Sequence, residues 1–267
     1  MSIWTTAILE PLINLLMFTY QALGGNLGIA IIAVTIMVRM ALLPLTNPGM
    51  QSAQKMQELK PELDKLKKKH KDDKQALAQA QLELYKKHGI NPLGGILPMI
   101  LQFVVLIGLF QAFNLILKPD LTVPDLNQYL YTFLKVGDGF QFNSDFFFWN
   151  LTRPDTINLT DPISILGFSL PGIPGILLIS AAVIQFVSTK YMMPKPTVPA
   201  KNAQSDEPDI ATMMQKQMLV MMPLMTLVIG LTFPAGLVLY WLTFSIIMVV
   251  QQKIIKSQPA KVTTTKK

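Results

Sequence analysis

The chain has 267 residues but no cysteine and only two histidines. Without cysteine it has no disulfides, no thiolate nucleophile, no Cys-based metal site and no lipoprotein anchor. Both histidines, His70 and His88, lie in one charged segment, so no histidine cluster is available for a metal. The first 25 residues contain no Lys or Arg, and we therefore expect no cleaved secretory signal.

Acidic residues are absent from every long apolar run of the chain. This excludes an intramembrane aspartyl protease and an acidic proton relay. The sequence has no P-loop glycine pattern, and it has no internal repeat of the kind that builds secondary transporters. We therefore expect neither an enzyme nor a bound cofactor or metal.

Five apolar runs are present, at residues 26–47, 96–117, 163–189, 218–233 and 234–255. A helix needs about 20 residues to cross a hydrocarbon core of about 30 Å. We predict an all-α polytopic membrane protein with five transmembrane helices. The third run has two prolines near its start, Pro171 and Pro174, and the fourth is short unless its helix begins earlier, near Met213.

The charge bias of the connecting segments sets the predicted orientation. Of the 22 Lys and Arg other than Arg39, 19 fall on the side that holds residues 48–95, 190–217 and 253–267. Positively charged loops face the cytosol. We expect a bacterial plasma membrane protein with its N-terminus outside, its C-terminus in the cytosol, and an external loop at residues 118–162 with a capping role.

Residues 1–25 are predicted to form an external amphipathic helix in the membrane interface. Its polar residues recur at spacings near four and are Ser2, Thr6, Glu10, Asn14 and Gln21. A sixth span over Met1–Leu23 is the alternative. It would invert every loop and place the basic segments outside, so we favour the interfacial helix.

The segment 48–95 is predicted to form a cytosolic basic helical hairpin. Its turn is His70–Asp73, with Asp72 or Asp73 as the N-cap of the second helix and Gly89 as its end. The hairpin is either a solvated spacer or a docking arm for anionic lipid, ribosomal RNA or a nascent chain.

Two further cytosolic segments have no predicted regular structure. Residues 190–217 read as a flexible linker, and residues 256–267 as a disordered basic tail.

Arg39 lies inside the first apolar run, Gly28–Leu45. A charge at that depth costs from about 3 to more than about 10 kcal/mol. Two readings remain open. The side chain snorkels to the nearer interface, since Leu45 is only about 9 Å further along a helix, or it faces a polar intramembrane cavity. Gln102 lies well inside the second run and can share such a cavity.

Five stretches of the chain match a known family, and they are Val38–Leu45, Lys55–Glu62, Tyr85–Gly95, Leu97–Gln102 and Phe233–Trp241. With these stretches in this order, residues 26–255 resemble the YidC-type membrane protein insertases, which have relatives in mitochondria and thylakoids. The large external domain of the Gram-negative members and the lipoprotein cysteine of many Gram-positive members are missing.

The resemblance implies a five-helix fold with a hydrophilic groove, open to the cytosol and to lipid and closed to the outside. Arg39, Gln102 and Trp241 match the groove positions, and we add Thr35 and Tyr240 as candidate groove residues. The third and fifth spans would guide an incoming helix.

The resemblance also implies partners. The chain would insert and help to fold newly made membrane proteins, alone or with the Sec translocon. We expect ribosome contact through the tail and hairpin, contact with anionic lipids, and no DNA binding. A channel or transporter for small anionic solutes is the runner-up, and a pure assembly scaffold is a third class.

Overall fold

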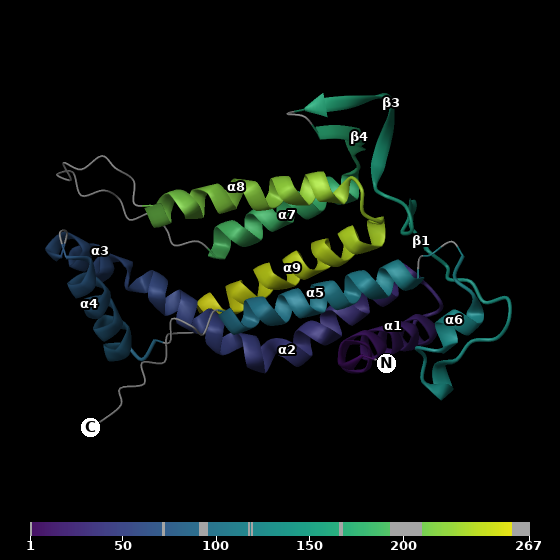
Figure 1. The fold of residues 1–267 in the computed structure, drawn as a ribbon, viewed down its shortest axis with the longest axis horizontal. Helices are drawn as coiled ribbons and strands as arrows, with labels where there is room; N and C mark the ends of the chain where they lie inside the picture. Colours follow the sequence, from purple (N-terminus) through teal and green to yellow (C-terminus); the bar gives the residue numbers. More distant parts are fainter. Residues whose placement is uncertain are drawn as a thin grey trace.

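The computed structural model describes residues 2–70, 73–90, 96–116, 118, 120–165, 168–192 and 210–257. The protein is mostly helical (Figure 1). Its helices are η1 (Thr5–Leu9), α1 (Glu10–Ala22), α2 (Leu27–Glu58), α3 (Lys60–Lys69), α4 (Lys74–Lys87), α5 (Ile96–Ile116), α6 (Val123–Asn127), η3 (Thr132–Leu134), α7 (Ile176–Met192), α8 (Ile210–Gly230) and α9 (Ala235–Ser257). Its strands are β1 (Asp145–Phe146), β2 (Trp149–Asn150), β3 (Thr156–Ile165) and β4 (Phe168–Pro174).

Helix α9 lies at the centre of the helical body and packs on α2 and on α7. Helix α8 packs mainly on α7, and α5 crosses α2 on the other side (Figure 1). Between α2 and α9 the core contains fully buried apolar side chains such as Ile31, Val34 and Val238. Two of the helices, over Leu27–Ser52 and Ala235–Ile254, are long and apolar enough to cross a membrane. Shorter apolar helices lie at Phe103–Ile116, Ile176–Tyr191 and Leu219–Gly230.

Helix α2 is longer than its predicted span of 26–47, because it continues to Glu58 through Pro44 and Pro48. Each proline removes one helical hydrogen bond, so a helix persists past two of them only where packing holds it. The side chain of Asn47, between the prolines, accepts a hydrogen bond of 2.8 Å from Gln251 of α9. This bond ties the proline-containing turn of α2 to its neighbour.

The basic segment after α2 forms two helices, α3 and α4, that lie against each other beyond the end of the helical body (Figure 1). Asp73, one of the two predicted candidates, is the N-cap of α4, and its carboxylate accepts hydrogen bonds from the backbone N–H groups of Gln75 and Ala76. Gly89 follows the helix with a φ of 62°, which a glycine adopts without steric cost.

The predicted third span of 163–189 differs from the structure at its start. Residues 163–165 and 168–174 belong to an antiparallel pair of strands, β3 and β4, and helix α7 begins only at Ile176. Two prolines, Pro171 and Pro174, lie in β4. In a helix interior each proline would remove a hydrogen bond, whereas a two-stranded sheet has only edge strands and accepts proline there. With β1 and β2 as a second pair, the fold is not all-α as predicted.

Helix α8 begins at Ile210, eight residues before the predicted start of the fourth span at 218. The helix is therefore long enough to be a span although its apolar run is short. Of the predicted linker 190–217, the two ends belong to α7 and α8, and residues 193–209 lie outside the described residues. Residues 258–267 of the predicted tail also lie outside them.

The N-terminal helix packs against protein on one side, with buried apolar side chains such as Ile13 and Leu16. Asn14, which the sequence places on the polar face, is also buried. Its amide donates to the carbonyl oxygen of Tyr129 and accepts from the backbone N–H of Tyr131, both at 2.7 Å. The polar face of α1 therefore holds the segment 118–162 rather than facing only water.

Candidate functional site

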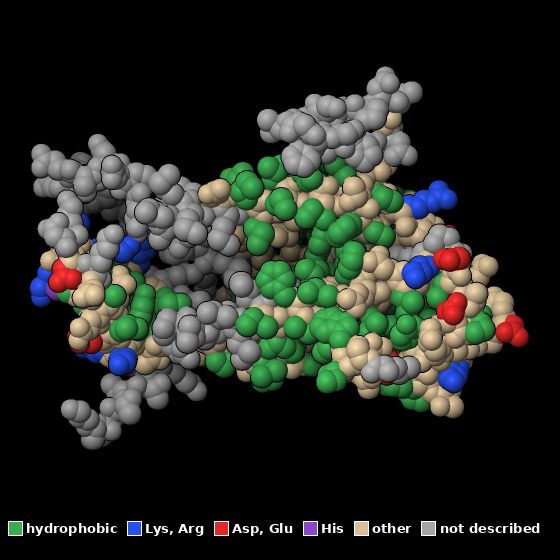
Figure 2. Space-filling model, viewed as in Figure 1, with side chains coloured by type: hydrophobic (Ala, Val, Ile, Leu, Met, Phe, Trp, Pro, Cys, Tyr) green, Lys and Arg blue, Asp and Glu red, His purple; other side chains and the backbone are tan. Residues whose placement is uncertain are grey.

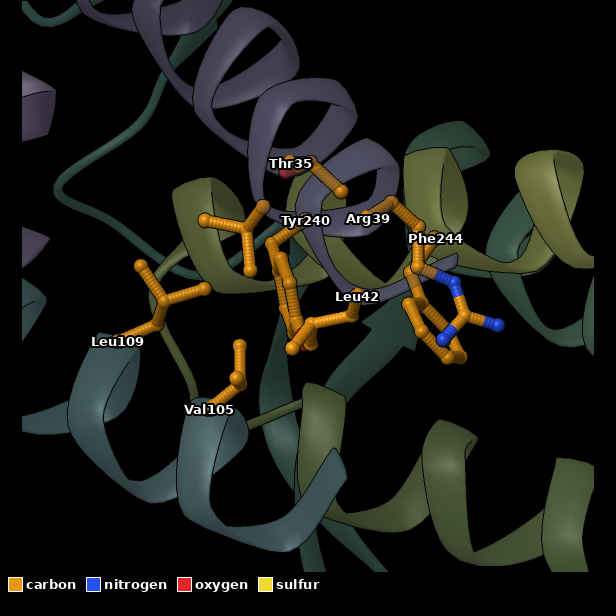
Figure 3. A pocket seen from close by; sticks show the side chains of 8 residues that line it. Thr35, Arg39, Leu42, Val105, Leu109, Tyr240 and Phe244 are labelled. Carbon is orange, nitrogen blue, oxygen red and sulfur yellow. The ribbon is translucent and has the colours of Figure 1, made fainter. Parts of the chain in front are cut away.

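Arg39 lies in α2 with its guanidinium directed along α9 (Figure 3). Its Nη2 donates a hydrogen bond of 3.3 Å to Oε1 of Gln251 and also contacts the sulfur of Met248. The guanidinium carbon is 4.5 Å from the centre of the Phe244 ring, a cation–π distance. The residue is only 7% exposed, so α9 supplies most of the surroundings of the charge.

A small cavity adjoins Arg39 between α2, α5 and α9 (Figure 3). Its lining residues are Thr35, Val38, Arg39, Leu42, Val105, Leu109, Tyr240 and Phe244. The space open to the centre of a water molecule is about 10 Å³, which is at the lower limit for one bound water. The helices are therefore closed around the charge in this conformation, and α5 closes the cavity with two apolar side chains.

The charge of Arg39 has no acidic partner in the part of the chain that the structure describes, where its hydrogen-bond acceptor is an amide oxygen. The Nε–H group is buried and has no hydrogen-bond acceptor among those residues. A buried donor without a partner is uncommon in folded proteins, and a buried cation without a carboxylate more so. The site is thus suited to receive an anionic or hydrogen-bond-accepting group.

A polar chain leads from Arg39 toward the end of the helical body that carries α3 and α4. Gln251 accepts from Arg39 and donates to Asn47, two turns further along α2. The neighbouring Gln252 and Thr46 are also buried. Sequence reasoning missed Asn47, Gln251 and Gln252. The sequence feature that could have revealed them is the pair of adjacent glutamines near the end of the last apolar run, together with the Asn47–Pro48 pair near the end of the first.

The structure brings three of the five predicted site residues together. Thr35 and Tyr240 line the cavity with Arg39. Trp241 does not line it, because consecutive residues point about 100° apart around a helix. Its ring instead stacks on Phe233 with centroids 5.9 Å apart. Gln102 lies in α5, but its side chain is outside the described part of the structure.

The sequence profile of the 60Kd inner membrane proteins matches residues 18–262, almost the whole chain. The chain belongs to this family. The resemblance stated from the five sequence stretches is thereby confirmed.

The chain matches different shares of the length of its individual relatives. It is 32% identical to the membrane protein insertase MisCA of Bacillus subtilis, over 97% of this chain and 81% of that protein. It is also 32% identical to the membrane protein insertase YidC of Pelobacter propionicus, over 94% of this chain but only 39% of the longer relative. Both relatives are bacterial membrane proteins, and so is this one.

A solved structure supports the fold of this family member. It is the crystal structure of an active YidC insertase with its first transmembrane domain resolved. The two structures superpose with a TM-score of 0.50 at 21% sequence identity, over 93% of this chain and 46% of the other. At this identity the likeness supports the fold alone.

Proposed function

We propose that this protein is a membrane protein insertase that receives newly made integral membrane proteins and helps them to enter the bilayer and fold. In this proposal α2, α5, α7, α8 and α9 are the five membrane spans. The N-terminal helix lies at the outer interface, and α3 and α4 lie in the cytosol. The family membership and the names of the relatives support the activity.

The distribution of side chains on the surface supports the placement in a bilayer. In the described part of the face seen in Figure 2, hydrophobic side chains cover the middle of the molecule and charged side chains lie toward its two ends. A bilayer requires such a band, about 30 Å tall, between polar zones.

The observation that carries the proposal is the state of Arg39. Its guanidinium is buried, held in place by α9, and not neutralised by any carboxylate of the described residues. Placing such a cation in a span opposes folding by several kcal/mol, so the residue is a functional-site hypothesis by default. We infer that it attracts acidic residues in the external tail of an incoming protein and holds them transiently.

The polar chain from Arg39 through Gln251 to Asn47 supports a cytosolic route to that site. A polypeptide tail in hydrocarbon loses several kcal/mol for every unsatisfied backbone group. Buried side-chain amides along α2 and α9 offer the tail hydrogen-bond partners. They thereby shorten the distance that the tail must cross in hydrocarbon without such partners. Gln102 precedes the cavity-lining Val105 by three residues of α5 and belongs to the same proposed groove, as do Thr35, Tyr240 and Trp241.

Entry of a tail requires the helices around Arg39 to separate, because the cavity is too small for a peptide. Helix α5 packs only weakly on α9, so we expect α5 to move away from α9. This movement opens a groove toward the cytosol and lipid, while α1 and the segment 118–162 keep the outer end closed.

Helices α7 and α9 are the proposed guide for the apolar helix of the substrate. Both present exposed apolar side chains along their length, including Ile179, Val183, Ile246 and Val250. Transfer of the substrate helix into lipid is favourable by about 25 cal/mol per Å² of apolar surface buried. No covalent step or nucleotide is needed, so we propose a non-enzymatic insertase.

The positive charge of the basic tail and of the α3–α4 pair supports two further proposed partners, the ribosome and anionic lipid. We also propose, from the family membership, that the Sec translocon cooperates on larger substrates.

Reconstitution separates this function from its rivals. Purified protein in vesicles should insert a small single-span substrate without other factors, and vesicles that lack the substrate should show no anionic-solute flux. Flux without insertion would favour a channel, and binding without insertion an assembly scaffold.

A further inference from the structure

The hairpin formed by β1 and β2 presents two exposed aromatic residues at its tip. Phe146 pairs with Trp149, which leaves Phe147 and Phe148 as a two-residue loop. Their side chains are 85% and 76% exposed. The base of the hairpin is held by Phe146 and Trp149, which are partly buried against the core, and the Phe148 ring contacts Trp149. The tip is therefore an apolar projection on a fixed base.

The backbone of this tip is unfavourable for its sequence. Phe147 has a φ of 55°, and it is the only non-glycine residue with a positive φ in the described part of the chain. The first position of a two-residue hairpin loop with this sign of φ is normally glycine. For a bulky residue it is a steric outlier, and outliers of this kind mark functional positions. The Phe147 ring has no buried environment within the protein that would offset the strain.

Two hydrogen bonds fix the height of the hairpin relative to the helices. The backbone N–H of Leu27 donates to the carbonyl oxygen of Asn143 at 3.1 Å, and the side-chain amide of Asn26 donates to the carbonyl oxygen of Asp145 at 2.9 Å. Phe146 lies directly over Gly28, in the first turn of α2. The hairpin is thus level with the start of the longest apolar helix.

The residues just after the hairpin bind the starts of two other helices. The backbone oxygens of Leu151 and Arg153 accept from Gly236 and Ala235 at the start of α9. The carboxylate of Asp155 accepts from Leu178 of α7 and from the Trp149 indole. A single segment therefore joins α2, α7 and α9 where each apolar helix begins, which is the level of the membrane–water boundary.

We propose that Phe147 and Phe148 insert into the lipid leaflet beside the starts of α2 and α7 and anchor this segment to the membrane. Apolar residues at those starts, Ile29 and Ile176, are exposed as well. Aromatic side chains at the boundary gain apolar contact without deep burial of polar groups. The anchor holds the joint between the three helix ends. It requires only that α2 spans the membrane and is independent of the insertase activity.

Spin labelling of the whole protein tests the anchor directly, because the natural sequence has no cysteine. Phe147→Cys and Phe148→Cys, each with a nitroxide label, are reconstituted in phosphatidylcholine–phosphatidylglycerol vesicles. Asp138→Cys, on an exposed part of the same loop, is the matched control. At 147 and 148 we expect faster collision with oxygen than with an aqueous nickel chelate, and the reverse at 138.

A second pair of variants distinguishes a tip that is anchored by its apolar side chains from a tip that only lies near the membrane. With the label at 147, Phe148→Leu should leave the nickel accessibility unchanged, and Phe148→Asp should raise it to the level seen at 138. Nickel accessibility at 147 equal to that at 138 would overturn the proposal by placing the tip in water. Low accessibility to both reagents would also overturn it, because the tip would then be covered by a protein partner.

Discussion

Gly28 shows how a single position fixes the joint between the helical body and the segment that covers its end. A Cβ placed on Gly28 meets the Phe146 side chain, with the Phe146 Cβ only 2.8 Å away and two ring atoms closer still. These are not the flexible end of a side chain, so an added methyl group must displace the hairpin. The close approach of α2 and β1 therefore requires glycine here.

We predict that Gly28→Ala lowers the free energy of unfolding by about 1–3 kcal/mol, the range for overpacking a core. Thermal unfolding in detergent measures this. Gly137→Ala is the control, because nothing lies within 4 Å of a Cβ there, and its effect should stay within about 0.5 kcal/mol. Equal stability of the two variants would show that the hairpin yields without cost.

At the scale of elements, the packing of α2 on α9 positions the charge. Phe244, Met248 and Gln251 recur at spacings of four and three on one face of α9, and all three contact Arg39. The amide of Gln251 then reaches Asn47 of α2. The contacts with this face of α9 therefore fix the position of the Arg39 guanidinium.

Gln251→Glu would place a carboxylate of the same shape beside the guanidinium. The resulting internal ion pair competes with the acidic tail of a substrate. We expect insertion of acidic-tail substrates to fall about tenfold, which corresponds to about 1.4 kcal/mol, with little change for neutral tails. Insertion into vesicles measures this, normalised to embedded protein.

Gln252→Glu is the matched control for that variant, because Gln252 is equally buried but forms no hydrogen bond with Arg39 among the described contacts. Equal loss in both variants would mean that a buried charge at this depth harms the protein in general.

How far the elements follow from sequence depends on the signal that each one carries. Helix α5 and the N-cap region of α4 around Asp73 were predictable, because the length of an apolar run and the presence of a capping side chain can be seen in a short stretch of sequence. The start of α7 was not, since the sequence just before it is as apolar as a span, and only the pairing of β4 (Phe168–Pro174) with β3 makes it a strand. Gln251 was overlooked because its role depends on the register between two helices far apart in sequence.

At the scale of the whole molecule, the apolar band with charged ends and the family membership describe a protein built to sit in a bacterial membrane. We propose that the end with 19 of the basic residues faces the cytosol, because positively charged segments favour that side. Arg39 could be singled out as a charge in an apolar run, whereas Thr35 and Tyr240 were named only as candidate groove residues beside the family resemblance. The narrowness of the cavity was not, because it depends on how closely α5 packs.

Topology is tested by labelling from outside the cell. Ser205→Cys should be unreactive toward an impermeant thiol reagent in intact cells and reactive after lysis, whereas Asp138→Cys should react in both. Labelling at position 205 in intact cells would invert the predicted orientation.

The central claim is that Arg39 acts as a cation for substrate tails, and insertion by Arg39 variants tests it most directly. For substrates with acidic external tails, Arg39→Lys should retain much of the activity, Arg39→Ala should lose about tenfold or more, about 1.4 kcal/mol, and Arg39→Glu should be worse through repulsion. Substrates with neutral tails should be much less affected. Normal insertion of an acidic-tail substrate by stably embedded Arg39→Ala would contradict the account.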